Sequence, residues 1–229
     1  MASEEISRND ASQCFVEEVG SKLLRDGLPS TKVALSVKSS RLAKNVPFDI
    51  TLNMTSMPKY PIRWQHFPKH SPCPSPLAEV VACFEEVSDL ISSFMNDKQE
   101  SNDVLAAVRP GLESRGFQVE TSKKSNGKLH VPVLYGANGK VDKFFEADAY
   151  HPVTKVVLEV EAGRGYVNNQ FLKDLFQACV MQDVEFAAIA VRQTYRKSKD
   201  YEKVLAFMET LYASNRLSLP LDGLLIIGY

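Results

Sequence analysis

Hydrophobic and polar residues alternate over two consecutive stretches in the middle of the chain, and this spacing predicts two β-strands. The first strand covers residues 143–150 and carries Asp148 on its polar face. The second covers residues 154–161, with Val and Leu on one face and Glu159 and Glu161 on the other. Its richness in Val and Leu predicts a central strand. Pairing of the two strands can therefore bring three carboxylates together beside a hydrophobic core.

Further hydrophobic periodicities predict an α/β core over residues 102–229. They predict strands at 117–122, 129–134, 186–191 and 223–227. They predict helices at 104–115, at 170–182 and from 198 or 200 to about 215, the first of them interrupted by Pro110 and Gly111. An Asn-Gly turn predicts a hairpin between the first two of these strands. The resulting order predicts a mixed central sheet flanked by helices.

Residues 1–101 are predicted to form an N-terminal α+β elaboration of this core. The periodicity predicts helices at 12–25 and 77–95, and strands at 32–37 and 47–54. Six prolines between residues 57 and 76 predict a segment without regular structure. In one interpretation, Tyr60, Trp64 and Phe67 of this segment pack as a lid on the core. In the other, its interleaved basic and aromatic residues face a nucleic acid.

Charge and composition restrict the classes of function. The net charge of −1 over 229 residues gives no overall attraction to nucleic acid, so a polyanion site requires local clustering of basic residues. Four widely spaced cysteines without a CxxC pair argue against a zinc site and are typical of a reduced cytosolic protein. No apolar run approaches the roughly 20 residues of a membrane span. We therefore expect a cytoplasmic protein without a membrane partner.

The acidic residues themselves indicate a cation. Unpaired charges beside a hydrophobic core are costly, and a divalent cation satisfies several carboxylates at once. Ligation by oxygen alone suits Mg²⁺ or Mn²⁺.

The order of elements, with an Asp on one strand and Glu-x-Glu on the next, resembles the PD-(D/E)xK nuclease superfamily, which has the restriction-endonuclease-like fold. In that superfamily an Asp precedes (D/E)-x-K, and a helix and a buried strand follow. Here Asp148 precedes Glu159-Val160-Glu161, and the helix at 170–182 and the strand at 186–191 follow. The stretch LESRGFQVET also looks like the opening helix and first strand of that core.

Two residues depart from the superfamily pattern. Ala147 stands where Pro is usual, and Glu161 stands where Lys is most frequent. Some restriction enzymes carry Glu at that second position, so the change does not exclude activity. It removes the usual cationic helper of the attacking water, and a Glu there can instead bind a second metal or act as a general base.

The resemblance implies hydrolysis of DNA phosphodiesters with Mg²⁺ or Mn²⁺. It implies that Asp148 and Glu159 bind the metal and that Glu161 orients or deprotonates the attacking water. Glu113 on the opening helix is a further candidate ligand, because an acid on that helix often joins this kind of site. For Glu113 the competing interpretation is a surface acid, and for the other three it is a solvated sheet face.

Several basic and polar residues are candidates for binding phosphate. Arg164, between two glycines, offers a bidentate donor after the second strand. Asn169, Lys173 and Gln177 share one helix face that can lean over the site, where Lys173 would replace the missing Lys. A solvated turn and a solvated helix face are the competing interpretations. Other basic residues that can line a groove for a nucleic-acid backbone are Lys123, Lys124, Lys128, Arg192, Arg196, Lys197 and Lys199.

Three functions follow from these alternatives. The first is a Mg²⁺-dependent DNA endonuclease, for which a homodimer would supply the two sites needed to cut both strands. The second is a catalytically inactive nuclease-fold protein that binds nucleic acid or a protein partner. The third is an unrelated α/β protein whose acids decorate its surface.

Overall fold

The computed structural model describes residues 60–96, 98–122, 124–163, 166 and 168–229. The helix predicted at 12–25 and the strands predicted at 32–37 and 47–54 lie outside these residues. Residues 60–96 and 98–101 are described, and they contribute a strand and two helices to the same compact unit as the downstream residues.

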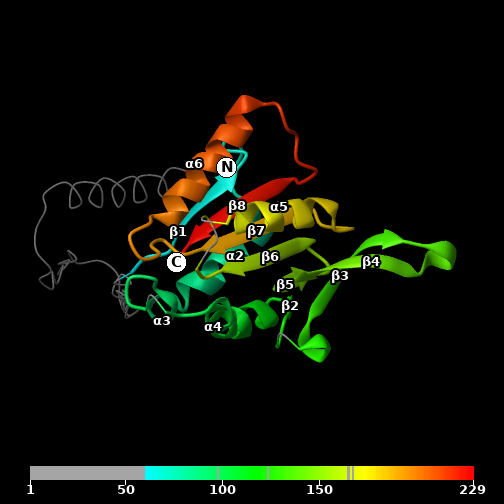
Figure 1. Ribbon diagram of the computed structural model, residues 1–229, viewed down its shortest axis with the longest axis horizontal. Coiled ribbons are helices and arrows are strands. Elements are labelled where there is room, and N and C mark those ends of the chain that lie inside the picture. The colour runs from blue at the N-terminus through cyan, green and yellow to red at the C-terminus, as the bar shows by residue number, and fades with distance from the viewer. Residues whose placement is uncertain (1–59, 97, 123, 164–165, 167) are drawn as a thin grey trace, which may run out of the picture. The chain divides into compact units, whose positions relative to one another are not determined.

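The described residues form a six-stranded mixed sheet and a separate two-stranded sheet. In spatial order, the large sheet contains β1 (Arg63–Phe67), β8 (Gly223–Gly228), β7 (Phe186–Val191), β6 (Val156–Glu161), β5 (Ala149–His151) and β2 (Gln118–Val119). Strands β6, β7 and β8 are parallel, whereas β1, β5 and β2 run antiparallel to their neighbours. The small sheet pairs β3 (Leu129–Tyr135) with β4 (Val141–Ala147), and this hairpin extends away from the large sheet (Figure 1).

Helices cover both faces of the large sheet (Figure 1). On one face lie α2 (Ser75–Glu85), α3 (Ser88–Ile91) and α4 (Ser101–Ser114). On the other lie α5 (Gln170–Val180) and α6 (Asp200–Ser214). Two short 3₁₀ turns, η1 (Ser125–Gly127) and η2 (Ala137–Gly139), complete the described elements. The predicted α/β class, with a mixed sheet flanked by helices, is confirmed.

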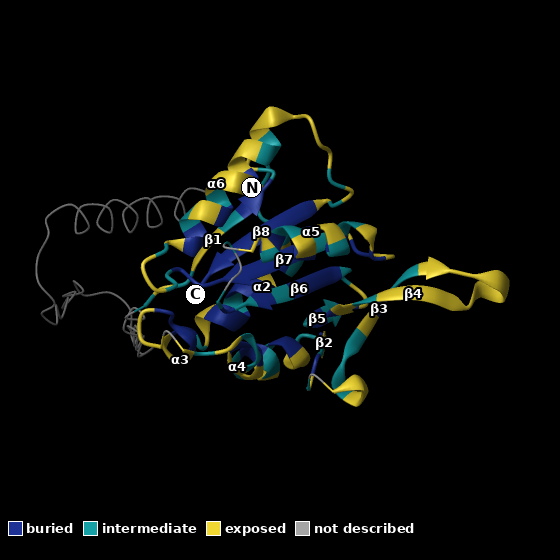
Figure 2. Cartoon of the chain, viewed as in Figure 1, coloured by how far each residue is buried: buried dark blue, intermediate teal, exposed yellow. Residues whose placement is uncertain are grey.

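Strand β6 lies in the middle of the sheet and is buried on both faces (Figure 2). Val156, Leu158 and Val160 belong to the hydrophobic core under α2 and α4. Val157 belongs to the second core, under α5 and α6. The predicted alternation and central position of this strand are therefore confirmed, and its glutamates lie at the end where the core gives way to polar residues.

The single strand predicted over residues 143–150 is instead two strands, β4 and β5, which meet at Asp148. The chain leaves the small sheet and enters the large one at this residue. The Asp148 carbonyl accepts a hydrogen bond from the Glu120 N–H at 2.7 Å. Its carboxylate accepts another from the Val160 N–H, also at 2.7 Å. The junction between the two sheets is thus fastened to β6.

The predicted Asn-Gly hairpin between strands 117–122 and 129–134 is wrong. Strand β2 is only two residues long and pairs with β5, while β3 pairs with β4. The Asn-Gly residues lie in η1, which carries the chain from the large sheet to the small one. The preference of Asn-Gly for a hairpin turn does not decide the pairing here. Strand β5 is already paired with β6, and its free edge offers β2 a partner in the large sheet.

Two predicted irregularities near proline are also wrong. Strand β1 forms within the proline-rich segment because Pro61 and Pro68 flank its paired residues, and because an edge strand bonds on one side only. Helix α4 continues through Pro110, which is exposed. Burial of Val104, Val108 and Leu112 on the opposite stripe holds that helix together.

The helix predicted at 77–95 is two helices, α2 and α3, because the chain departs from helical geometry at Val87. Within the proline-rich segment Phe67 is buried, whereas Trp64 is 42% exposed. The aromatic residues of this segment therefore do not all pack on the core.

Replacing Leu158 by Ala is expected to lower the free energy of unfolding by about 2–5 kcal/mol, because this side chain is fully buried in the middle of β6. Urea-induced unfolding followed by circular dichroism measures the change. As a control, Val153→Ala removes an exposed side chain and should change the same free energy by less than about 0.5 kcal/mol. Equal effects of the two substitutions would contradict the central position of β6.

Candidate functional site

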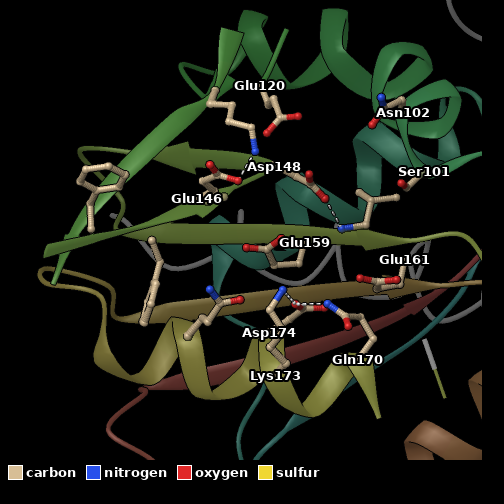
Figure 3. A pocket seen from close by; sticks show the side chains of 16 residues that line it. Ser101, Asn102, Glu120, Glu146, Asp148, Glu159, Glu161, Gln170, Lys173 and Asp174 are labelled. Carbon is tan, nitrogen blue, oxygen red and sulfur yellow. Dashed lines mark hydrogen bonds and ion pairs between the residues drawn. The ribbon is translucent and has the colours of Figure 1, made fainter. Parts of the chain in front are cut away.

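A cavity of about 550 Å³ lies where β6, α5, the root of the β3–β4 hairpin and the start of α4 meet (Figure 3). Acidic side chains dominate its lining: Glu120, Glu146, Asp148, Glu159, Glu161 and Asp174. Other polar lining residues are Ser101, Asn102, Lys128, Gln170, Lys173 and Gln177. The structure thus brings Asp148, Glu159 and Glu161 to one cavity, together with three further acids from β4, from α5 and from the segment after β2.

Glu159 and Glu161 are two residues apart on β6 and both point into the cavity, as Figure 3 shows. Burial raises the pKa of Glu159 well above its ordinary value, and the nearby Asp148 carboxylate raises it further. Burial, followed by the charge of Asp174, raises the pKa of Glu161 to about 8. The surroundings of the cavity therefore disfavour the ionised forms of Glu159 and Glu161, although β6 holds both side chains there.

Asp174 on α5 faces the two glutamates across the cavity. Its side chain is almost fully buried, and burial raises its pKa. Oδ1 accepts a hydrogen bond from Gln170 Nε2 at 3.4 Å and lies 3.9 Å from Lys173 Nζ. Oδ2 has no hydrogen-bond partner among the described residues. This buried acceptor is an unsatisfied group of the kind that a cation or a bound proton would satisfy.

The neighbouring Asp174 carboxyl is a cause of the raised pKa of Glu161, second only to burial. Two ionised carboxylates repel each other, so the pair is more stable when one of them holds a proton. Because the pKa of Glu161 is the one raised to about 8, Glu161 holds that proton at neutral pH.

Lys173 and Gln177, predicted to lean over the site, do line the cavity. Lys173 is exposed, and its positive charge opposes the rise in the pKa values of Glu159 and Glu161. Asn169 occupies the N-cap position of α5 without capping through its side chain, and it is not among the lining residues.

The structure does not bring Glu113 to the cavity. Glu113 is exposed near the C-terminal end of α4, whereas α4 lines the cavity through Ser101 and Asn102 at its other end. Eleven residues of helix separate Asn102 from Glu113, a distance of about 16 Å. The acid that joins the site from this part of the chain is Glu120, just after β2.

Arg164 and Lys123 lie outside the described residues. Lys128 lines the acidic cavity and forms an ion pair with Glu146. Arg192 and Arg196 line a second cavity next to it. Lys124, Lys197 and Lys199 are exposed and line neither cavity.

Sequence reasoning passed over Asp174, although a signal was present. Phe171, Leu175 and Ala178 define the buried stripe of α5, and Asp174 falls on that stripe, three residues after Phe171. An acid on the buried stripe of an amphipathic helix requires a partner inside the fold. Glu120 gave no such signal, because it stands at the end of a two-residue strand.

The donor set of the acidic cavity fits a hard divalent cation, since its candidate ligands are all oxygen atoms. The acids line the wall without converging on one point. Over the part of the chain that the structure describes, no three His, Cys, Asp or Glu side chains are grouped as a metal coordination sphere. Glutamate side chains reach different points of the cavity by rotation about their side-chain bonds, so Glu159 and Glu161 can adjust to a ligand.

The chain matches no protein-family model, no curated protein and no solved structure. None of the described helices has both the length and the apolar character needed to cross a membrane.

The raised pKa of Glu161 predicts that the protein loses stability as the pH rises from about 5 to about 8 in EDTA. The unfolded chain releases the Glu161 proton near its ordinary pKa of about 4.3, whereas the folded chain keeps it until about pH 8. Over this window the unfolded state binds fewer protons, so the free energy of unfolding falls with pH. Glu161→Gln should remove part of that slope.

Urea unfolding at a series of pH values measures this slope. The control is Glu113→Gln, which removes an exposed acid outside the cavity and should keep the wild-type slope. A slope unchanged in Glu161→Gln would mean that Glu161 ionises normally in the folded protein.

Proposed function

We propose that the chain is a metal-dependent phosphodiesterase that hydrolyses DNA and has a restriction-endonuclease-like core. One observation carries this proposal. Asp148, Glu159, Glu161 and Asp174, from three separate elements, line one cavity in which burial and mutual repulsion raise the pKa of Glu159 and Glu161. A protein that gathers acids in this way at the end of its central strand loses stability when they ionise, unless a ligand compensates their charge.

Asp148, Glu159 and Asp174 are the residues that would hold Mg²⁺ or Mn²⁺. When bound, such a cation lowers the pKa of coordinated water and stabilises the negative charge that develops on a phosphate under attack. The Val160 N–H fixes the orientation of Asp148 through its hydrogen bond to Oδ2. Gln170 and Lys173 contact Asp174 through Oδ1, which leaves Oδ2 for a ligand.

Glu161 is the proton acceptor for the attacking water in its ionised form, and a cation bound beside it would favour that form by lowering its pKa. Its pKa of about 8 lies close to working pH, where a general base is most effective. In the hydrolysis, the water oxygen forms a bond to phosphorus, the bridging P–O bond breaks, the water proton passes to Glu161, and the leaving oxygen takes a proton from solvent. Lys173 extends from α5 into solvent beside Glu159 and Glu161, and its ammonium group can contact a non-bridging phosphate oxygen.

A second candidate is a catalytically inactive nuclease-fold protein that binds nucleic acid. The observation that favours it is the spread of the acids along the cavity wall, since the described residues do not form a ready three-ligand group. The two candidates differ in one outcome, because both bind DNA but only the first cleaves it.

Asp148→Asn is expected to reduce cleavage of supercoiled plasmid in Mg²⁺ or Mn²⁺ by at least about 100-fold. The substitution removes the charge but keeps an oxygen that can accept the Val160 N–H, so the junction of the sheets is preserved. Agarose electrophoresis measures nicked and linear plasmid. Glu113→Gln is the matched control and should cleave at the wild-type rate, because Glu113 lies outside the cavity. DNA binding without cleavage by the wild type would instead support the inactive candidate.

Mn²⁺ is expected to raise the midpoint of thermal unfolding of the wild type, because a cation bound only by the folded state stabilises it by mass action. Asp174→Asn should abolish most of this increase, since it removes the charge of the buried carboxylate that faces the cavity. Differential scanning fluorimetry with Mn²⁺ against EDTA measures the shift, and Glu113→Gln again serves as control. A full shift in Asp174→Asn would exclude Asp174 from the site.

A further inference from the structure

A second cavity, of about 730 Å³, adjoins the acidic cavity. The two share Ser101 and Glu161 in their linings. Basic residues and an aromatic residue distinguish the second cavity: Lys98, Arg192, Arg196 and Tyr195. We call it the arginine cavity.

Acidic residues predominate in the lining of the acidic cavity, whereas basic residues predominate in that of the arginine cavity. Six acids and two lysines line the acidic cavity, which suits a cation. Three basic residues and two acids, Glu100 and Glu161, line the arginine cavity, which suits an anion. One of those two acids, Glu161, belongs to the wall between the cavities. A cation site and an anion site with a common wall form an arrangement that a chain of phosphates can span.

Tyr195 organises the basic side of the arginine cavity. The guanidinium carbon of Arg192 lies 5.5 Å from the centre of the Tyr195 ring, and that of Arg196 lies 5.3 Å from it. Tyr195 and Ser198 exchange two backbone hydrogen bonds of 2.9 Å, which close the turn that carries Arg196. Cation–π contacts of this kind restrict the guanidinium groups before a ligand arrives.

Arg192 and Arg196 have different parts in this arrangement. Arg192 is almost fully buried, and it donates a hydrogen bond to the Gln99 carbonyl, which ties the segment before α4 to the end of β7. Arg196 is exposed at the cavity. Its guanidinium group is therefore the one available to a ligand from solvent, and it can bind a phosphate through two N–H groups.

We propose that the arginine cavity is a subsite for the phosphate next to the scissile phosphate on the same nucleic-acid strand. Arg196 binds that phosphate, Tyr195 positions Arg196, and Lys98 adds a further positive charge to the lining of the cavity. The inference rests on the proposed function, because it takes the acidic cavity as the place where the strand is cut. It specifies the substrate as a polynucleotide strand that continues past the cleaved bond.

Fluorescence anisotropy of a short labelled DNA duplex in EDTA tests this subsite without cleavage. Arg196→Ala is expected to weaken binding about tenfold and to reduce the slope of log Kd against log salt by about one phosphate contact. The matched control is Arg216→Ala, which removes the same charge from an exposed residue that lines neither cavity, and it should change Kd less than about twofold. Arg196→Lys should recover only part of the loss, because Lys cannot form a bidentate contact.

Thermal stabilisation by Mn²⁺ is measured for the same variants, and it separates failure of the subsite from failure of the proposed function. If Mn²⁺ stabilises all variants and Arg196→Ala binds DNA as Arg216→Ala does, the subsite is wrong and the acidic cavity stands. If the wild type neither binds the duplex nor responds to Mn²⁺, both proposals fall. A nucleoside monophosphate that binds as tightly as the duplex, and only with Arg196 present, would overturn the strand subsite in favour of a mononucleotide site.

Discussion

The acidic cavity depends on the hydrogen bond that the Val160 N–H donates to the Asp148 carboxylate. Strand β5 pairs with β6 only as far as Ala149 and Leu158, because the preceding residues turn away into the small sheet. Beyond that point the edge of β6 has lost its neighbour, and the Asp148 side chain supplies the acceptor that a longer strand would have supplied. The departure of β4 therefore opens the cavity, and Asp148 covers the backbone that this departure exposes.

The same bond gives Asp148 a structural role as well as a chemical one. A carboxylate that accepts a backbone N–H is held in one orientation, which costs no further ordering when a ligand arrives. One of its oxygens is used within the fold. The negative charge remains, so Asp148 still raises the pKa of Glu159 across the cavity. Asp148 thus holds the junction of the two sheets and, through its charge, disfavours ionisation of Glu159.

The sequence was most informative where a single periodicity decided the outcome. Alternation along β6 correctly placed Val156, Leu158 and Val160 in a core. It also placed Glu159 and Glu161 on one side, because successive side chains of a strand point to opposite faces of the sheet. It could not reveal that the strand over residues 143–150 breaks at Asp148, since alternation continues through the break. Pairing partners are set by the rest of the sheet, so β2 joined β5 against its local turn signal.

The site itself was predictable on the strands and less so elsewhere. Three acids were found from their spacing, whereas Asp174 comes from a helix whose rotation about its axis decides which residues reach the cavity. Glu113 illustrates the opposite error, because membership of the right helix says nothing about which end of it lies at the site. Which end of a helix lies at the site is decided by its packing against the rest of the fold, and the local sequence pattern does not contain that information.

The root of the β3–β4 hairpin is clamped although the rest of the hairpin extends away from the sheet. Gln182 donates its backbone N–H to the Pro132 carbonyl at 2.8 Å and its side-chain amide to the Val133 carbonyl at 3.1 Å. Val131 and Ala147 are buried just inside this clamp. These contacts hold the inner part of the ribbon, so a ligand or partner that binds at the tip of the hairpin is expected to leave Asp148, one residue past Ala147, in place.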